Sequence, residues 1–247
     1  MDDEEKVKTY EIEDIFEMFD RKFTHEEIEN YIKSAKLAGQ KINDKWQVTQ
    51  ESINKFMKIL AEERAYMVGP FTVDISNVKI QGRILDIGGG GEGVIGQIKK
   101  EMVIAIDKKK NELEEAPDSG DLKIVMDAKD LKFLDNTFNT VTAFYSMMYI
   151  PSSDHNIIFQ EIRRVLKING EFLLWDVNIP SRTSEAKDIY GVTLNVKIPE
   201  KIIEAGYGAY WVRRKDAEYY KEVAKNVGFK ITEEKVENKI FFLRFKK

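Results

Sequence analysis

The amino-acid sequence predicts an α/β fold: a doubly wound, mostly parallel seven-stranded sheet with an antiparallel C-terminal strand, preceded by an N-terminal helical segment. Two observations support this prediction. From residue 83 onward, short runs rich in β-branched residues alternate with helical stretches, which is typical of parallel strands joined by crossover helices. The first of these runs leads directly into the glycine-rich segment 88–96. Before residue 68, apolar residues recur at helical spacing instead.

Residues 1–67 are expected to form a cap of three helices. Apolar side chains repeat at the offsets of one helical face over 12–19 and 53–60. Between them, Thr24 and Glu27 form a capping-box pattern, and Gly39 is the expected stop. Consecutive short helices also suggest a helix-turn-helix DNA reader, but residues 1–66 carry 16 acidic against 11 basic side chains. The charge favours a packing element over DNA binding.

Residues 68–247 are expected to form the main domain. The last two strand-like runs are separated only by Glu237-Asn238, which predicts an antiparallel hairpin at the sheet edge. The middle helix is expected to end at Asn169-Gly170. Strands are predicted near 83–87, 102–106, 122–126, 140–145, 171–177, 229–236 and 239–246, and helices near 92–100, 154–167 and 214–227.

An insertion at about 181–212 is longer than a bare crossover requires. Val192, Leu194 and Val196 alternate with polar residues, which predicts a strand pair with Pro199 near its turn. We hypothesise that this insertion and the N-terminal helices form a lid over the substrate pocket. The alternatives are an extension of the main sheet or a dimer contact.

Composition narrows the class of protein. The 247 residues carry a formal net charge of −4, which gives no general attraction to nucleic acid. There is no cysteine, so disulfides and thiolate metal sites are excluded. The acidic start Met1-Asp2-Asp3 is unlike a signal peptide, and no apolar run approaches the ~18 residues of a membrane span. A cytoplasmic protein without membrane association is expected; a homodimer is compatible with the sequence.

The segment 84–96 holds the strongest functional signal. An apolar strand runs into six glycines within nine positions and then into a helix. Glycines let the backbone turn sharply and approach a ligand closely. The run Gly88-x-Gly90-x-x-Gly93 satisfies the dinucleotide fingerprint, and Asp107 follows at the end of the next strand. An acid there accepts from ribose hydroxyls in any adenosine-containing cofactor, so this motif alone leaves the cofactor open.

Three further features decide between cofactors. Asp86 stands two residues before Gly88, Met126-Asp127-Ala128 closes the third strand, and the pattern Leu131-x-Phe133-x-Asp135-x-x-Phe138 leads into the fourth. Together they resemble the class I S-adenosylmethionine-dependent methyltransferases, particularly the small-molecule group that includes the ubiquinone and menaquinone biosynthesis enzymes. The resemblance covers roughly residues 80–178.

This resemblance implies a Rossmann-like sheet and S-adenosyl-L-methionine as the cofactor. In the family, the first acid binds the methionine amino group, and the third accepts from the adenine amino group. The residues that the resemblance assigns to the cofactor are Asp86, Gly88, Gly89, Gly90, Asp107, Lys108, Asp127, Ala128, Tyr145 and Ser146. Two departures, Lys132 and Asn139, fall where the family shapes a turn. A third, Tyr149, stands where many relatives carry histidine, so catalysis by histidine is not expected.

The candidate catalytic residues are Tyr145, Tyr149 and Asp176. The two tyrosines follow the fourth strand, where the resemblance places the methyl group, and Asp176 ends the fifth, beyond whose carboxyl end ligands bind. The alternatives are ordinary packing for the tyrosines and a solvated or capping role for Asp176. His155 is expected at the surface near a helix start. No cluster of residues shows metal-ligand spacing.

The predicted function is methyl transfer to a small molecule. Nucleic-acid bases are disfavoured as acceptors, because the Pro-Pro-aromatic motif of such enzymes is replaced by Tyr145-Ser146-Met147-Met148. Two alternatives stay open at this point: an NAD(P)-dependent oxidoreductase, and a non-catalytic module that binds S-adenosylmethionine.

Overall fold

The computed structural model describes residues 8–19, 23–183 and 187–247. The chain divides into two compact units, Met1–Tyr66 and Met67–Lys247. Each unit has its own buried apolar side chains, and the two are described separately below.

The N-terminal unit contains the three predicted helices and three strands that the sequence analysis missed. The helices are α1 (Ile12–Met18), α2 (His25–Lys33) and α3 (Gln50–Arg64). The strands β1 (Thr9–Tyr10), β2 (Gln40–Ile42) and β3 (Lys45–Thr49) form a sheet of order β1-β3-β2. The capping box is confirmed, since Thr24 Oγ1 accepts from the Glu27 amide at 3.1 Å. The prediction of three helices is therefore confirmed, and the three short strands are an addition to it.

The missed hairpin has a local cause. Asn43 and Asp44, between β2 and β3, both have positive φ, 49° and 60°. Two such residues in a row make the tight turn whose twist suits an antiparallel pair. The turn could therefore have been predicted from the Asn-Asp pair. The strand β2 could not, because all three of its residues are exposed and it has no alternation of buried and exposed residues.

The second unit contains the predicted seven-stranded sheet. Its order is β12-β13-β9-β8-β5-β6-β7, with β5 to β9 parallel and β13 antiparallel to β9. This confirms the doubly wound sheet and the antiparallel C-terminal hairpin. The strands are β5 (Ile84–Ile87), β6 (Val103–Asp107), β7 (Leu122–Val125), β8 (Phe138–Phe144), β9 (Leu166–Val177), β12 (Lys230–Glu237) and β13 (Ile240–Lys246).

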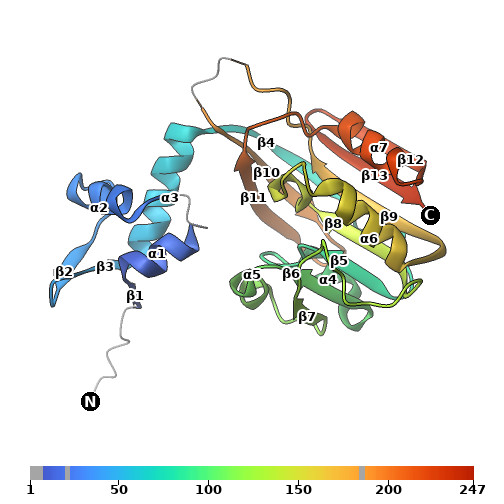
Figure 1. Ribbon diagram of the computed structural model, residues 1–247, viewed down its shortest axis with the longest axis horizontal. Helices are drawn as coiled ribbons and strands as arrows, with labels where there is room; N and C mark the ends of the chain where they lie inside the picture. Colours follow the sequence, from blue (N-terminus) through green and yellow to red (C-terminus); the bar gives the residue numbers. More distant parts are fainter. Residues whose placement is uncertain (1–7, 20–22, 184–186) are drawn as a thin grey trace. The chain divides into compact units, whose positions relative to one another are not determined.

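Helices cover the two faces unequally. The helices α6 (His155–Val165) and α7 (Ala217–Asn226) pack on one face (Figure 1). The other face is packed near β5 and β6 by α4 (Val94–Lys99) and α5 (Lys110–Glu115). Two short 3₁₀ helices, η1 (Lys100–Met102) and η2 (Met147–Tyr149), lie in the connections between strands of this sheet. The helix α5 was not predicted.

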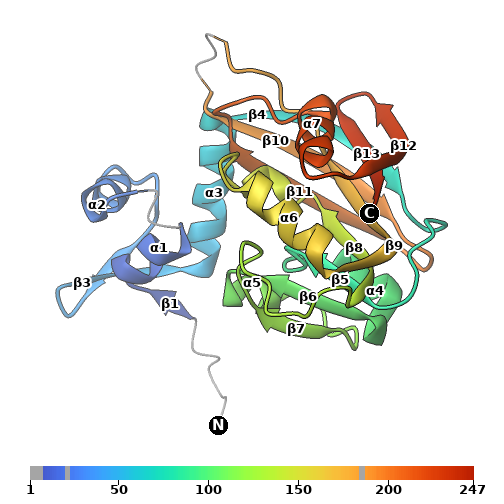
Figure 2. The same ribbon diagram turned by 45° about the vertical axis from the view of Figure 1, so that its right-hand side comes forward.

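A second, smaller sheet consists of β4 (Ala65–Asp74), β10 (Ile189–Lys197) and β11 (Ile202–Tyr210), in the order β11-β10-β4 (Figure 2). The strands β10 and β11 are the predicted pair, with Lys197 opposite Ile202 across the turn that contains Pro199. Because these strands form a sheet of their own, the alternative of an extension of the main sheet is wrong. The third member, β4, was not predicted.

One helix boundary was also predicted wrongly. The helix α6 ends at Val165, and β9 begins at once with Leu166, which pairs with Phe138. Both Leu166 and Phe138 are fully buried, and this pairing ends the helix before Asn169 is reached. Asn169, at φ 64°, instead lies in an irregular stretch of the pairing between β8 and β9. Among the described residues, no helix is long and apolar enough to cross a membrane.

Candidate functional site

The glycine loop between β5 and α4 is packed so tightly that side chains are excluded. The amides of Gly88 and Gly89 both donate to the Ile106 carbonyl, at 2.8 and 3.0 Å, which ties the loop to β6. A Cβ at Gly88 would overlap with the Ser146 side chain, and one at Gly90 would lie 2.6 Å from Glu112 Cβ. Glycine is therefore required here, and the loop presents bare backbone at the carboxyl end of β5.

Asp86 is the buried acid of the site. It is 3% exposed, and its Oδ1 accepts from Thr142 Oγ1 at 2.6 Å. Burial raises the pKa of Asp86 to about 7, although the Thr142 hydrogen bond acts in the opposite direction. A Cβ at Gly89 would lie 2.8 Å from Asp86 Oδ2, so this carboxylate abuts the glycine loop. A cationic group bound there would favour the ionised carboxylate.

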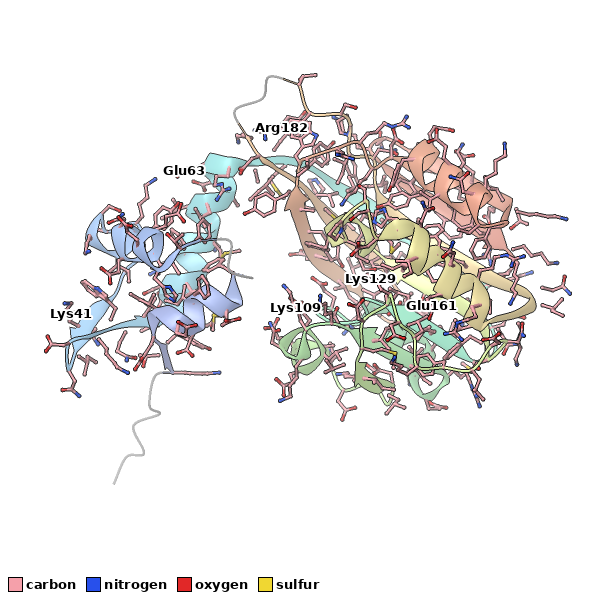
Figure 3. All side chains as sticks on the ribbon, in the orientation of Figure 1. Lys41, Glu63, Lys109, Lys129, Glu161 and Arg182 are labelled. Atoms are coloured by element: carbon pink, nitrogen blue, oxygen red, sulfur yellow. The ribbon has the colours of Figure 1, made fainter. Side chains whose placement is uncertain are left out.

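Two more carboxylates follow the next strands. Asp107 ends β6, and its Oδ1 accepts from the amide of Lys109 at 2.8 Å; Lys109 precedes α5 (Figure 3). Asp127 follows β7 and is half-buried, as is Ala128. The ammonium of Lys108 lies 3.8 Å from Asp127 Oδ2 with its own side chain exposed. Since β5, β6 and β7 are adjacent and parallel, all three predicted acids meet at one edge of the sheet.

Tyr145 and Ser146 follow β8 at the same edge. The Ser146 hydroxyl donates to the Ile87 carbonyl at 2.6 Å, which holds this segment against the end of β5. Tyr145 has a positive φ of 50° and is 1% exposed. Its hydroxyl has no hydrogen-bond partner among the described residues, and burial raises its pKa. A buried hydroxyl without a partner is costly, so this position suits a polar ligand atom.

The insertion covers this edge through contacts that sequence reasoning missed. The Tyr207 ring of β11 stacks on Tyr145, with centroids 5.2 Å apart, and its hydroxyl donates to Glu92 Oε2 at 3.0 Å. The Gly208 amide donates to the Tyr149 hydroxyl at 3.1 Å, while the Tyr149 ring is half exposed. The aromatic run around 206–211 was visible in the sequence, but nothing in it indicated these partners.

Asp176 lies near the two tyrosines, because its charge adds to burial in raising the pKa of Tyr145 and of Tyr149. Alternation along β9 places it on the face of Leu174, toward α6 and α7, whereas Trp175 packs on the opposite face. Its side chain is fully buried; Oδ1 accepts from the Val177 amide at 2.8 Å, and Oδ2 has no partner among the described residues. Burial raises its pKa to about 7 despite the nearby Lys215 ammonium. The alternative of a solvated carboxylate is wrong.

Lys215 and His155 support the segment that carries Tyr149. The Lys215 ammonium, 9% exposed, donates to the carbonyls of Met148 and Ile150 at 2.8 and 2.7 Å. His155 is fully buried, with Nε2 3.2 Å from the Met147 carbonyl oxygen, and burial lowers its pKa to about 4. The expectation of a surface histidine is therefore wrong. Lys215 had no sequence signal, because its role depends on partners some 65 residues away.

Comparison with known sequences identifies the central region. A family model described as a methyltransferase domain matches residues 85–174. The ubiquinone/menaquinone biosynthesis C-methyltransferase UbiE of Pseudomonas paraeruginosa is 29% identical over 176 residues, which cover 64% of this chain and 62% of that protein. The chain therefore spans less than two thirds of this relative's length.

Comparison with solved structures supports the fold. A protein of Pyrococcus horikoshii matches with a TM-score of 0.52 and 18% identity, over 80% of this chain and 90% of that one. A SAM-dependent methyltransferase of Methanosarcina mazei matches with a TM-score of 0.50 and 17% identity, over 71% and 99%. At these identities the likeness shows a shared Rossmann-like fold.

Proposed function

We propose that this chain, which belongs to the class I S-adenosylmethionine-dependent methyltransferase superfamily, transfers a methyl group from S-adenosyl-L-methionine to a small-molecule acceptor. The observation that carries the proposal is the edge of the main sheet. There the side-chain-free glycine loop and the acids after β5, β6 and β7 come together. The bound cofactor supplies a sulfonium methyl group that is open to direct displacement.

The residues of this edge suit the parts of that cofactor. Asp107 accepts hydrogen bonds from the ribose hydroxyls, as an acid at the end of the second parallel strand does. Asp86 provides a negative charge for the amino group, and the Gly90 amide donates to the carboxylate, since the amides of Gly88 and Gly89 already donate to the Ile106 carbonyl. Asp127 and Ala128 bind the adenine ring, and Lys108 flanks them at the surface.

The chemical step requires mainly positioning. With the cofactor bound, an electron pair of the acceptor would form the new bond to the methyl carbon while the carbon–sulfur bond breaks and its electron pair goes to sulfur. Holding the reacting atoms in line and excluding water contributes on the order of 7–11 kcal/mol. Tyr145 and Tyr149, with the β10–β11 insertion over them, line the reacting end. Asp176 is fully buried and acts on both tyrosines through its charge.

The surroundings of the reaction are also part of this proposal. We also propose that the enzyme acts in the cytoplasm and that its acceptor is not a nucleic acid. The net charge of −4, which offers no general attraction to phosphate backbones, supports the second statement. The insertion at 181–212 serves as a cover of the acceptor. Support for the cover comes from the contacts of Tyr207 and Gly208 described above.

Calorimetric titration with S-adenosylmethionine, S-adenosylhomocysteine and NAD, run in parallel, tests the proposal. Both adenosyl ligands are expected to bind, and Asp107→Ala to weaken them at least tenfold, or about 1.4 kcal/mol. Asp118→Ala, which removes an exposed acid between α5 and β7, is the matched control and is expected to bind normally. Binding of NAD alone would overturn the proposal in favour of an oxidoreductase.

A further inference from the structure

One acidic side chain of the glycine loop is held by a neutral partner. Glu92 lies between Gly91 and Gly93 and is half-buried. Its Oε2 accepts a hydrogen bond from the Tyr207 hydroxyl at 3.0 Å, and among the described residues no basic side chain forms an ion pair with it. A partly buried charge is unfavourable without a counter-charge. Glu92 therefore suits a cationic group of a ligand.

Tyr207 fixes the direction in which this carboxylate points. It comes from β11, 115 residues further along the chain, and its ring stacks on Tyr145 with 10° between the ring planes. Tyr145 is 1% exposed, so the stack anchors Tyr207 to the core. The Tyr207 hydroxyl thereby holds the Glu92 carboxylate on the side of the glycine loop that faces the insertion.

The charge of Glu92 acts on the space between the glycine loop and β11. Burial raises the pKa of the Tyr207 and Tyr149 hydroxyls, and the negative charge of Glu92 raises both further. Two cations of this region have other partners: Lys215 donates to backbone carbonyls around η2, and Lys109 lies 3.9 Å from an acid of α5. The electrostatic potential beside Glu92 is therefore negative.

The covalent structure of the proposed cofactor brings its sulfur to this space. The sulfur joins the methionine part, for whose amino group we propose Asp86 of β5, to the ribose, for which we propose Asp107 of β6. The two strands are neighbours, and the glycine loop is hydrogen-bonded to the Ile106 carbonyl of β6. A group that links the two acids would thus lie beside the loop that carries Glu92.

S-adenosylmethionine and its product S-adenosylhomocysteine differ only at this sulfur. The first carries a methyl group and a positive charge there, whereas the second is a neutral thioether. We propose that Glu92 makes the site selective for the sulfonium over the thioether, and that Tyr207 is the positioning residue that holds the Glu92 carboxylate. This inference rests on the proposed function. It adds a way to release the product, because the attraction to Glu92 is lost once the methyl group has been transferred.

Calorimetric titration of the full chain with both ligands tests the proposal, because contacts to the shared parts cancel in the ratio of the two dissociation constants. Glu92→Gln removes the charge but keeps an oxygen that accepts from Tyr207. It is expected to weaken S-adenosylmethionine about tenfold, or about 1.4 kcal/mol, and S-adenosylhomocysteine less than about twofold. Normal binding of S-adenosylhomocysteine also shows that the variant is folded.

Two further variants separate positioning from charge. Tyr207→Phe keeps the ring stack and removes only the hydrogen bond to Glu92, so it is expected to shift the ratio in the same direction by about threefold. Glu115→Gln, which neutralises an exposed acid at the end of α5, is the matched control and is expected to leave the ratio unchanged.

The outcomes distinguish this inference from the proposed function. If the unaltered chain bound neither ligand, the proposed function would fail and the inference with it. If both ligands bound and Glu92→Gln weakened them equally or not at all, only the selectivity by charge would be overturned. A shift in Glu115→Gln as large as in Glu92→Gln would overturn it too, since net charge would then explain the effect. A shift in Glu92→Gln but none in Tyr207→Phe would overturn the positioning role of Tyr207.

Discussion

The proposed cofactor edge and the proposed acceptor side of this molecule are built in opposite ways. At the edge, each predicted residue lies at the carboxyl end of its own strand: Asp86 within β5 and the glycines after it, Asp107 as the last residue of β6, and Asp127 two residues after β7. On the acceptor side, Tyr145 meets Tyr207, Trp175 meets Phe242, and Lys215 reaches Met148, across 60 residues or more. A site built from residues at strand ends and local turns can be predicted from the sequence, whereas a site built from contacts between distant residues cannot.

The largest expected effect comes from breaking the cofactor edge at Gly88. Gly88→Ala places a Cβ into the Ser146 side chain at a residue with φ 69°, where side chains are strained. S-adenosylmethionine binding is expected to fall more than ~100-fold, about 2.7 kcal/mol, in calorimetric titration. Gly206→Ala in β11 is the matched control, since a Cβ there meets nothing within 4 Å. Equal effects of the two changes would contradict a tightly packed loop.

The next effect concerns the buried charge beneath the acceptor side. Folded Asp176 keeps its proton up to about pH 7, whereas the unfolded chain loses it near the ordinary value of 3.8. Between these values the folded state binds more protons, so this group makes the free energy of unfolding fall as pH rises. Asp176→Asn is expected to become more stable relative to the unaltered chain by about 2–3 kcal/mol from pH 5 to pH 8, measured by urea unfolding.

The comparison of the two proteins isolates Asp176 from the other buried acid. Asp86, whose pKa is also raised to about 7, contributes equally to both and cancels in the difference. A difference in stability that does not change with pH would show that Asp176 is ionised throughout this range, held by Lys215 and the Val177 amide.

The smallest effect tests the contact that joins the two sides. Tyr207→Phe keeps the ring on Tyr145 but removes the hydrogen bond to Glu92, which is expected to cost about 1 kcal/mol in unfolding free energy. Glu92→Gln weakens the same bond from the glycine loop. In a double-mutant cycle the two losses are expected to be less than additive. Full additivity would mean that the insertion does not hold the loop through this pair.

Much of the fold followed from local pattern. The seven strands, the crossover helices α4, α6 and α7, and the β10–β11 pair were predicted from alternation, helical spacing and turn residues. The predicted end of α6 at Asn169-Gly170 was wrong, because the pairing of Leu166 with Phe138 outweighed a good stop signal. Strand β4 was not predicted, because Gly69 and Pro70 are unfavourable in strands; the strand is stabilised by pairing with β10 and by the burial of Val68 and Val73.

The sequence by itself determined the sheet, its order of motifs, and the acids that meet at its carboxyl edge. Parallel strands end at one edge, so a residue that follows its strand is placed there whatever the rest of the chain does. Only the tertiary structure decided that His155 and Asp176 are buried, that Lys215 supports η2, and that Tyr207 of β11 stacks on Tyr145. The burial of a polar group and the contact between distant side chains depend on which distant segments pack together. A local sequence pattern does not show this, so neither could be predicted from the sequence.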